Sequence, residues 1–392
     1  MPTSRSSSPI KAVNLGGWLV TEGWITPNLF DQIPINKDLL DGTQIRLKSV
    51  AHNKYLSSKK GGGSTVDANR QVASGWETFK CLFVDLLRPT QMAVTANHPE
   101  DTNWGDNDPS VFLLSVVGQL QGEFQVTNGY GLDKASSVMT EHWNNFIVED
   151  DFKFMSENGL TATRIPVGWW IMFDPNPPSP FVGGSLQALD NAFSWQREIQ
   201  PKDYHRPPRS TRLAEWYASR SGLYAIELIN EPLAPGVILD TLKRYYKAGY
   251  DVVRKYTDAY VIMSNRLSIS DPTELVQFCS GFEKSVIDVH YYNLFSSIFD
   301  GMTVQQNINY VYHNRASTLG SLTMSNGPLI FVGEWVDEMG VNNASKGDYQ
   351  HFGATQLDVY GRATFGWSYW TLKNVDEHWS LEWMIKNGYI RV

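Results

Sequence analysis

The sequence has few charged residues, only two cysteines and no long apolar run. Charged residues make up 19% of the 392 positions and the net charge is −8, which argues against a basic face for nucleic acid. Cys81 and Cys279 provide neither a disulfide framework nor a metal-ligand set. No apolar run approaches the ~18 residues of a membrane-spanning helix. Residues 1–11 are rich in serine and lack the apolar centre of a signal peptide.

Aromatic residues are abundant by contrast, with 14 Trp, 18 Tyr and 18 Phe. A tryptophan-rich core accounts for such a composition. Sugar binding also accounts for it, because the C–H faces of a pyranose stack on flat rings. Composition alone favours the core. The length allows one large domain and a smaller one.

Buried strands alternate with helical segments through most of the chain, which predicts a parallel α/β fold. Seven strands are predicted, at residues 11–19, 161–167, 224–230, 259–265, 286–292, 329–335 and 363–370. A (β/α)₈ TIM barrel has eight, and the third would lie within residues 196–210. That segment contains three prolines and no β-forming apolar run. We therefore predict a TIM barrel without its third strand, in which the second and fourth strands have unpaired edges unless they pair directly.

Residues 41–131 have a different character, with short alternating strands and tight turns. These features predict a small all-β module that interrupts the barrel after its first strand. The predicted organisation is therefore a barrel start at 1–40, an inserted module at 41–131 and the remainder of the barrel at 132–392.

Two glutamates follow apolar runs at the ends of predicted strands. Glu231 comes directly after residues 225–230 and is followed by Pro232, which cannot continue a central strand. Glu334 ends the apolar run that begins at residue 329. The carboxyl ends of barrel strands meet on one face. Glycoside hydrolysis needs two carboxyl groups in different protonation states, so this pair predicts such a site.

Other polar and aromatic side chains also stand at predicted strand ends. Each has an ordinary structural explanation alone, but their joint position favours a site. Arg164 lies in a mostly apolar strand and needs an acidic partner, for which Glu334 is the candidate. Glu22 by itself is most simply a surface acid. The remaining strand-end residues are Asn230, His290, Tyr292 and Trp370.

Four of these motifs resemble glycoside hydrolase family 5. They are Leu-Ile-Asn-Glu-Pro at 228–232, Val-Gly-Glu-Trp at 332–335, Asp-Val-His-Tyr-Tyr at 288–292 and Thr-Arg-Ile-Pro-Val at 163–167. Residues 13–22 and 366–370 look like the exo-β-1,3-glucanase branch of that family. The inserted module is similar to the fascin-like β-trefoil module of plant members, although 91 residues are too few for a complete trefoil. The family's third strand carries a histidine motif without a counterpart here, so the chain looks internally deleted.

The resemblance implies a retaining hydrolase that releases glucose from the non-reducing end of β-1,3-glucan. Glu231 is then the acid/base and Glu334 the nucleophile, while Glu22 and Trp370 contact the terminal glucose. Arg164, Asn230, His290 and Tyr292 form the supporting shell. The resemblance also implies a β-glucan partner and an extracellular or cell-wall location, and we expect a monomer with no metal and no cofactor. Two alternatives are a catalytically impaired glycan-binding protein and an enzyme acting on β-1,4-mannan or β-1,4-glucan.

Overall fold

The structure is a computed structural model. It describes residues 8–33, 44–49, 52–58, 66–73, 77, 79–80, 112–118, 122–196 and 212–392. Cys81 and residues 197–210 of the predicted gap at 196–210 lie outside these ranges. The chain divides into two compact units, one of residues 1–27 with 136–392 and one of residues 28–135. The predicted domain boundaries at 40/41 and 131/132 stay a prediction.

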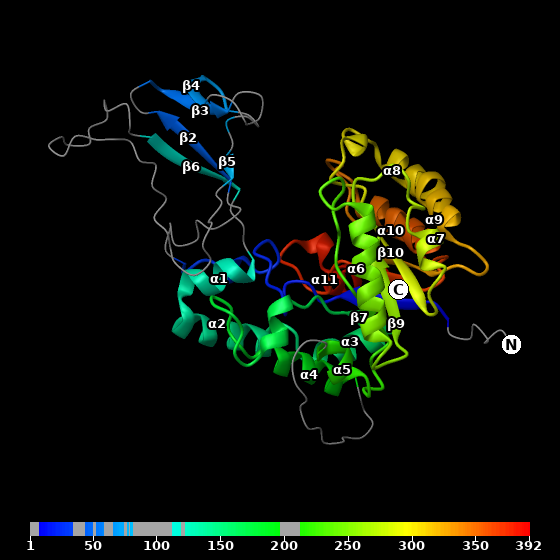
Figure 1. The fold of residues 1–392 in the computed structure, drawn as a ribbon. Helices are drawn as coiled ribbons and strands as arrows, with labels where there is room; N and C mark the ends of the chain where they lie inside the picture. The colour runs from blue at the N-terminus through cyan, green and yellow to red at the C-terminus, as the bar shows by residue number, and fades with distance from the viewer. Residues whose placement is uncertain are drawn as a thin grey trace. The chain divides into compact units, whose positions relative to one another are not determined.

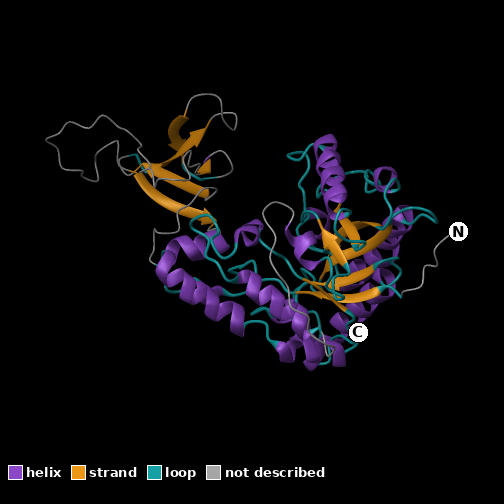
Figure 2. Ribbon diagram, turned by 60° about the horizontal axis from the view of Figure 1, so that its bottom comes forward, coloured by secondary structure: helices purple, strands orange, loops and turns teal. Residues whose placement is uncertain are grey.

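The larger unit is built on a seven-stranded parallel sheet in the order β7-β1-β12-β11-β10-β9-β8. All seven strands were predicted from the sequence, and the parallel α/β fold is confirmed. Figure 2 shows these strands in orange, side by side, with helices around them. Their bounds are β1 Ile10–Asn14, β7 Ala162–Arg164, β8 Ala225–Glu227, β9 Tyr260–Ser264, β10 Ser285–Tyr291, β11 Leu329–Trp335 and β12 Gly366–Tyr369.

The sheet is open between β7 and β8, which stand at its two ends. In the part of the chain that the structure describes, no strand pairs with their outer edges, and the two do not pair directly. Both edge strands have three half-buried residues, whereas β10 and β11 have seven residues that are almost all buried. The second and fourth predicted strands are therefore the edges of the described sheet.

The register between β10 and β11 contains a bulge at Gly333. Val289 pairs with Val332, but the next residue, His290, pairs with Glu334. The Gly333 N–H donates to Asp288 Oδ1 at 2.7 Å. A Cβ at Gly333 would lie 2.2 Å from that oxygen, so glycine is required for this approach.

Helices follow the strands and cover the outside of the sheet. Figure 1 shows α6 beside β9, and α8 beside α10. Side-chain capping starts two of them: Thr303 accepts from the N–H of Gln306 at α8, and Ser345 accepts from that of Asp348 at α10. The helices are α2 Leu132–Asn145, α3 Glu149–Glu157, α4 Ser185–Trp195, α5 Arg212–Tyr217, α6 Leu239–Val253, α7 Val276–Cys279, α8 Val304–Tyr310, α9 Ala316–Leu322, α10 Lys346–Tyr360 and α11 Leu381–Lys386.

An apolar cluster fills the sheet interior near the amino ends of its strands. It contains Ile262, Val286, Phe331 and Phe365, all at most 5% exposed. Tyr224 packs on Phe365 with ring centroids 5.3 Å apart. Large apolar side chains thus pack at this end, and the polar strand-end groups lie at the opposite, carboxyl ends of the strands.

The smaller unit contains a five-stranded antiparallel sheet. Its strands are β2 Gln44–Ser49, β3 Lys54–Ser58, β4 Val66–Arg70, β5 Phe79–Lys80 and β6 Phe112–Gly118, and helix α1 Glu123–Tyr130 follows. The turn between β2 and β3 includes Asn53 with φ of 52°, a left-handed conformation that asparagine tolerates. Residues 81–111 of the predicted module lie outside the described ranges. Among the described helices of the whole chain, none has the length and apolarity to cross a membrane.

Candidate active site

A cavity of about 2700 Å³ lies at the carboxyl ends of the strands and extends beside β7 and β8. All eight site residues predicted from the sequence line it: Glu22, Arg164, Asn230, Glu231, His290, Tyr292, Glu334 and Trp370. They come from segments up to 348 residues apart in the chain, brought together because parallel strands end on one side of the sheet.

Glu334 is the more enclosed of the two strand-end acids, with its side chain 6% exposed. Arg164 Nη1 donates to Oε1 at 3.0 Å, and the Tyr292 hydroxyl donates to Oε2 at 2.7 Å. The ion pair expected between Arg164 and Glu334 is therefore present. Burial raises the pKa of the Glu334 carboxyl above its usual 4.5, and the charges of His290 and Arg164 oppose that rise.

Glu231 follows the edge strand β8 and has a side chain 32% exposed. Its backbone φ is +44°, an unusual conformation for glutamate that turns the chain at the cavity. His290 Nδ1 lies 2.6 Å from Glu231 Oε1. A carboxylate oxygen of Glu231, a ring nitrogen of His290 and a carboxylate oxygen of Glu334 all lie within 4.8 Å of one another.

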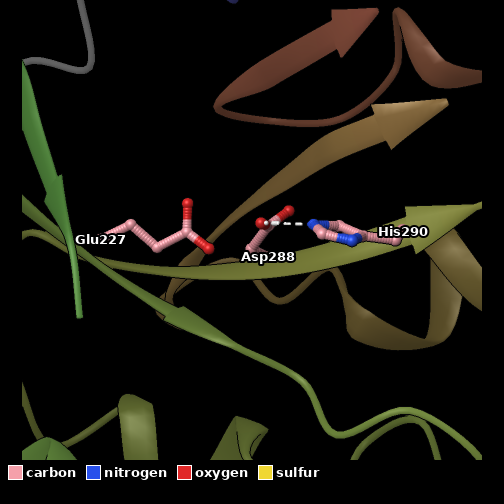
Figure 3. Close-up of side chains that lie close together, drawn as sticks. All are labelled: Glu227, Asp288 and His290. Carbon is pink, nitrogen blue, oxygen red and sulfur yellow. Dashed lines mark hydrogen bonds and ion pairs between the residues drawn. The ribbon is translucent and has the colours of Figure 1, made fainter. Parts of the chain in front are cut away.

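His290 stands between carboxylates, with Nε2 3.0 Å from Asp288 Oδ2 and Nδ1 3.4 Å from Glu334 Oε2. Burial lowers the pKa of the imidazole, but the facing carboxylates of Glu334 and Asp288 outweigh it and hold the pKa well above its usual value. In this charged form both ring nitrogens donate. Figure 3 shows the Asp288–His290 hydrogen bond and the Glu227 carboxylate directed toward Asp288.

The Glu22 side chain lines the cavity and is not a free surface acid. Trp24 Nε1 donates to its Oε2 at 3.0 Å, and the Gly17 N–H donates to Oε1 at 3.3 Å. Burial raises the pKa of the Glu22 carboxyl to about 7, against the lowering effect of these two hydrogen bonds. Trp370 packs against the same turn, where a Cβ on Gly16 would lie 2.8 Å from its ring.

Further aromatic rings continue the cavity wall. Trp379 packs edge-on against Trp24 with centroids 5.1 Å apart and lies 5.8 Å from Tyr292. Phe295 is 83% exposed and 6.2 Å from Trp379. Exposed rings beside buried carboxylates are the combination that sugar binding uses, because rings take the C–H faces and polar groups take the hydroxyls.

Three further polar residues belong to the site but were not predicted from the sequence, namely Asn14, Glu227 and Asp288. Arg164 Nη1 donates to Asn14 Oδ1 at 2.8 Å, and Glu227 accepts from Arg164 Nε at 2.6 Å. Glu227 and Asp288 are also charged residues in apolar strands and, like Arg164, need partners there. That signal was present in the sequence.

Two residue groups have the composition of metal sites, Glu227 with Asp288 and His290, and Glu231 with His290 and Glu334. Arg164 lies within 4.0 Å of Glu227, Asp288 and Glu334. Because the guanidinium and the charged imidazole already neutralise these carboxylates, a metal cation would meet repulsion there. The donor arrangement fits a proton-handling site better than a metal centre.

Paired acids at the carboxyl ends of a curved parallel sheet with outer helices define the class of barrel hydrolases. Residues 208–376 match the family described as Cellulase (glycosyl hydrolase family 5). This match confirms the resemblance to glycosyl hydrolase family 5 that the motifs indicated. Residues 36–88 match a domain of unknown function, DUF7910. The fascin-like character and the internal deletion stay predictions.

Curated relatives extend over almost the whole chain. The probable glucan 1,3-beta-glucosidase A of Aspergillus clavatus is 25% identical, covering 97% of this chain and 87% of its own length. Glucan 1,3-beta-glucosidase 1 of Schizosaccharomyces pombe is 24% identical, covering 98% and 88%. The crystal structure of rutinosidase from Aspergillus niger has a TM-score of 0.61 at 16% identity, covering 98% of both chains, and supports the fold.

Proposed function

We propose that this chain is a retaining glycoside hydrolase that releases glucose from the non-reducing end of β-1,3-glucan. The observation that carries the proposal is the spacing of Glu231 and Glu334, whose nearest carboxylate oxygens lie within 4.8 Å. Retaining enzymes hold their two carboxyl groups about 5–5.5 Å apart, whereas inverting enzymes need room for a water between them.

Glu334 is the proposed nucleophile. The ion pair with Arg164 and the hydrogen bond from Tyr292 hold both oxygens and favour the ionised form that attacks the anomeric carbon. Because burial raises the pKa of Glu334, that ionised form is lost at a higher pH than for an exposed glutamate. Activity should therefore fall on the acid side as pH drops through this raised pKa.

Glu231 is the proposed acid/base. Its greater exposure suits a group that meets both the leaving sugar and the incoming water. The 2.6 Å contact with His290 Nδ1 places a ring proton beside Glu231 Oε1 when the imidazole is charged. The pair Glu231 and His290 thus holds the proton that departs with the leaving group, and Asp288 fixes the ring from the other side.

The exo-acting β-1,3 specificity is supported by the names of the curated relatives and by the cavity wall. Glu22 presents a carboxyl group to the cavity, and Trp370 presents a ring. We infer that these two residues bind the hydroxyls and the flat face of the terminal glucose.

The direct test is glucose release from laminarin by the purified chain, beside Glu334→Gln. The wild type should release glucose, with the β-anomer formed first by proton NMR, and the variant should not. Asp358→Asn, at an exposed acid on α10, is the control and should retain full activity. Equal glucose release by wild type and Glu334→Gln contradicts the proposal, as does α-glucose as the first product.

A second candidate is a glycan-binding protein with little turnover. The observation that favours it is the open edge between β7 and β8, because within the described residues the strand before Glu231 is paired on one side only. Titration calorimetry with laminari-oligosaccharides measures binding separately from turnover. Binding by the wild type without glucose release selects this candidate.

A further inference from the structure

We propose that Glu227 is a positioning residue that, through Arg164, links the two edge strands of the open sheet and holds the nucleophile Glu334 in place. The inference rests on the proposed function for the role of Glu334. It adds a role for a residue outside the two-acid site.

Arg164 and Glu227 are the last residues of β7 and β8, the two strands at opposite ends of the sheet. In the described chain these strands share no backbone ladder. Their side chains meet instead: Arg164 Nε donates to Glu227 Oε2 at 2.6 Å, and Nη2 donates to Oε1 at 3.1 Å. Both side chains are only 13–14% exposed. A bidentate pair of this kind fixes orientation as well as distance.

The other N–H groups of Arg164 are also engaged. Nη1 donates to Asn14 Oδ1 at 2.8 Å and to Glu334 Oε1 at 3.0 Å, and Nη2 donates to Asn230 Oδ1 at 2.7 Å. All five donors of the guanidinium are therefore used. The two carboxylate oxygens of Glu227 set the plane of the guanidinium. That plane determines where Nη1 meets Glu334, the proposed nucleophile.

A second acid competes for the same guanidinium. Asp288 Oδ2 lies 4.0 Å from Arg164 Nη2 and already accepts from His290. Without the Glu227 carboxylate, the Arg164 side chain is free to turn toward Asp288, away from Glu334. Figure 3 shows the Glu227 carboxylate directed toward Asp288. Glu227 therefore keeps Nη2 from turning to Asp288 and so keeps Nη1 directed at Glu334.

The chain offers a matched control. Arg266 and Glu274 form the same bidentate pair, with Nε to Oε1 at 2.8 Å and Nη2 to Oε2 at 2.6 Å, at 13% and 9% exposure. Neither residue lines the cavity. A purely structural ion pair should behave like this one when it is broken.

The test compares Glu227→Gln, Glu227→Asp and Glu274→Gln. Glutamine keeps the shape of Glu227 but offers one acceptor in place of two, so kcat on laminarin should fall about 100-fold with KM changed less than about threefold. Glu227→Asp keeps the charge and should recover part of kcat. Glu227→Gln and Glu274→Gln should lower the Tm by similar amounts, but Glu274→Gln should leave kcat unchanged.

A crystal structure of Glu227→Gln gives a readout that needs no turnover. The Arg164 Nη1 to Glu334 Oε1 contact should lengthen beyond hydrogen-bond distance. If the wild type cleaves no glycan but this contact is lost in the variant, the positioning role stands and the proposed function fails. If the contact and kcat are both unchanged while the Tm falls, the pair is structural only and the inference is overturned.

Discussion

The two catalytic candidates are supported in different ways. Glu334 ends β11, a seven-residue buried strand paired on both sides. Glu231 follows β8, a three-residue, half-buried strand whose one partner in the described part of the chain is β9. Backbone hydrogen bonds to β10 and β12 hold the strand that carries Glu334. Side-chain contacts from Arg164 and His290 hold the segment around Glu231. The difference teaches that an open sheet can retain a site geometry when charged side chains span the opening.

The largest expected effect separates the roles of the two acids. Glu231→Ala should lower hydrolysis of laminarin by about 10²–10⁴-fold, because the leaving oxygen loses its proton donor. With 2,4-dinitrophenyl β-glucoside, whose leaving group needs no proton, the formation of the glycosyl-enzyme should stay near the wild-type rate. Single-turnover kinetics measures this step. Glu334→Ala should lose activity with both substrates, and equal losses for Glu231→Ala with both would break the assigned division of roles.

A stability comparison tests how much less the edge strand contributes. Ile287 on β10 is fully buried, so Ile287→Ala should reduce the free energy of unfolding by about 2–5 kcal/mol through lost apolar burial and a cavity. Ile226 on β8 is half-buried, and Ile226→Ala should cost less, about 1 kcal/mol. Urea titration of both variants measures the difference. Equal losses would show that the edge is as firmly packed as the centre.

The smallest effect concerns Glu22, whose pKa is raised from 4.5 to about 7 by burial. A raised pKa in the folded state means that the protonated form stabilises the fold, fully below pH 4.5 and not above pH 7. Glu22→Gln mimics that form at every pH. Its Tm relative to wild type should therefore rise by about 2–4 °C between pH 4.5 and pH 8, measured by calorimetry. An unchanged Tm difference would contradict the shift.

Most of the barrel could be predicted from the sequence because its strands are apolar runs that end abruptly in polar groups. Seven of the eight site residues were predicted by the same signal and Glu22 through the family resemblance, and the structure places all eight at one cavity. Their catalytic and binding roles remain proposals.

The contacts of Glu227 and Asn14 could not be predicted, because strand order and register decide them. The sequence shows that Arg164 needs a partner, but not that it meets residues from β8, β1 and β11 together. The positions of Arg164 and His290 beside Asp288 likewise result from how the chain packs. Charges in apolar strands identify such residues, and only the three-dimensional arrangement pairs them.

The bulge at Gly333 changes which side chains of β11 point to the inner face of the sheet. Phe331 and Glu334 both line the cavity, yet they are three residues apart, and side chains of a regular strand alternate. Because Gly333 is an extra residue in the ladder, the alternation of side chains shifts by one position after it. Glu334, and not Trp335, is therefore the next residue after Phe331 on the inner side. If the ladder were regular and Gly333 took a place in the pairing, Glu334 would stand an odd number of residues from Phe331, and its carboxylate would turn to the outer face of the sheet.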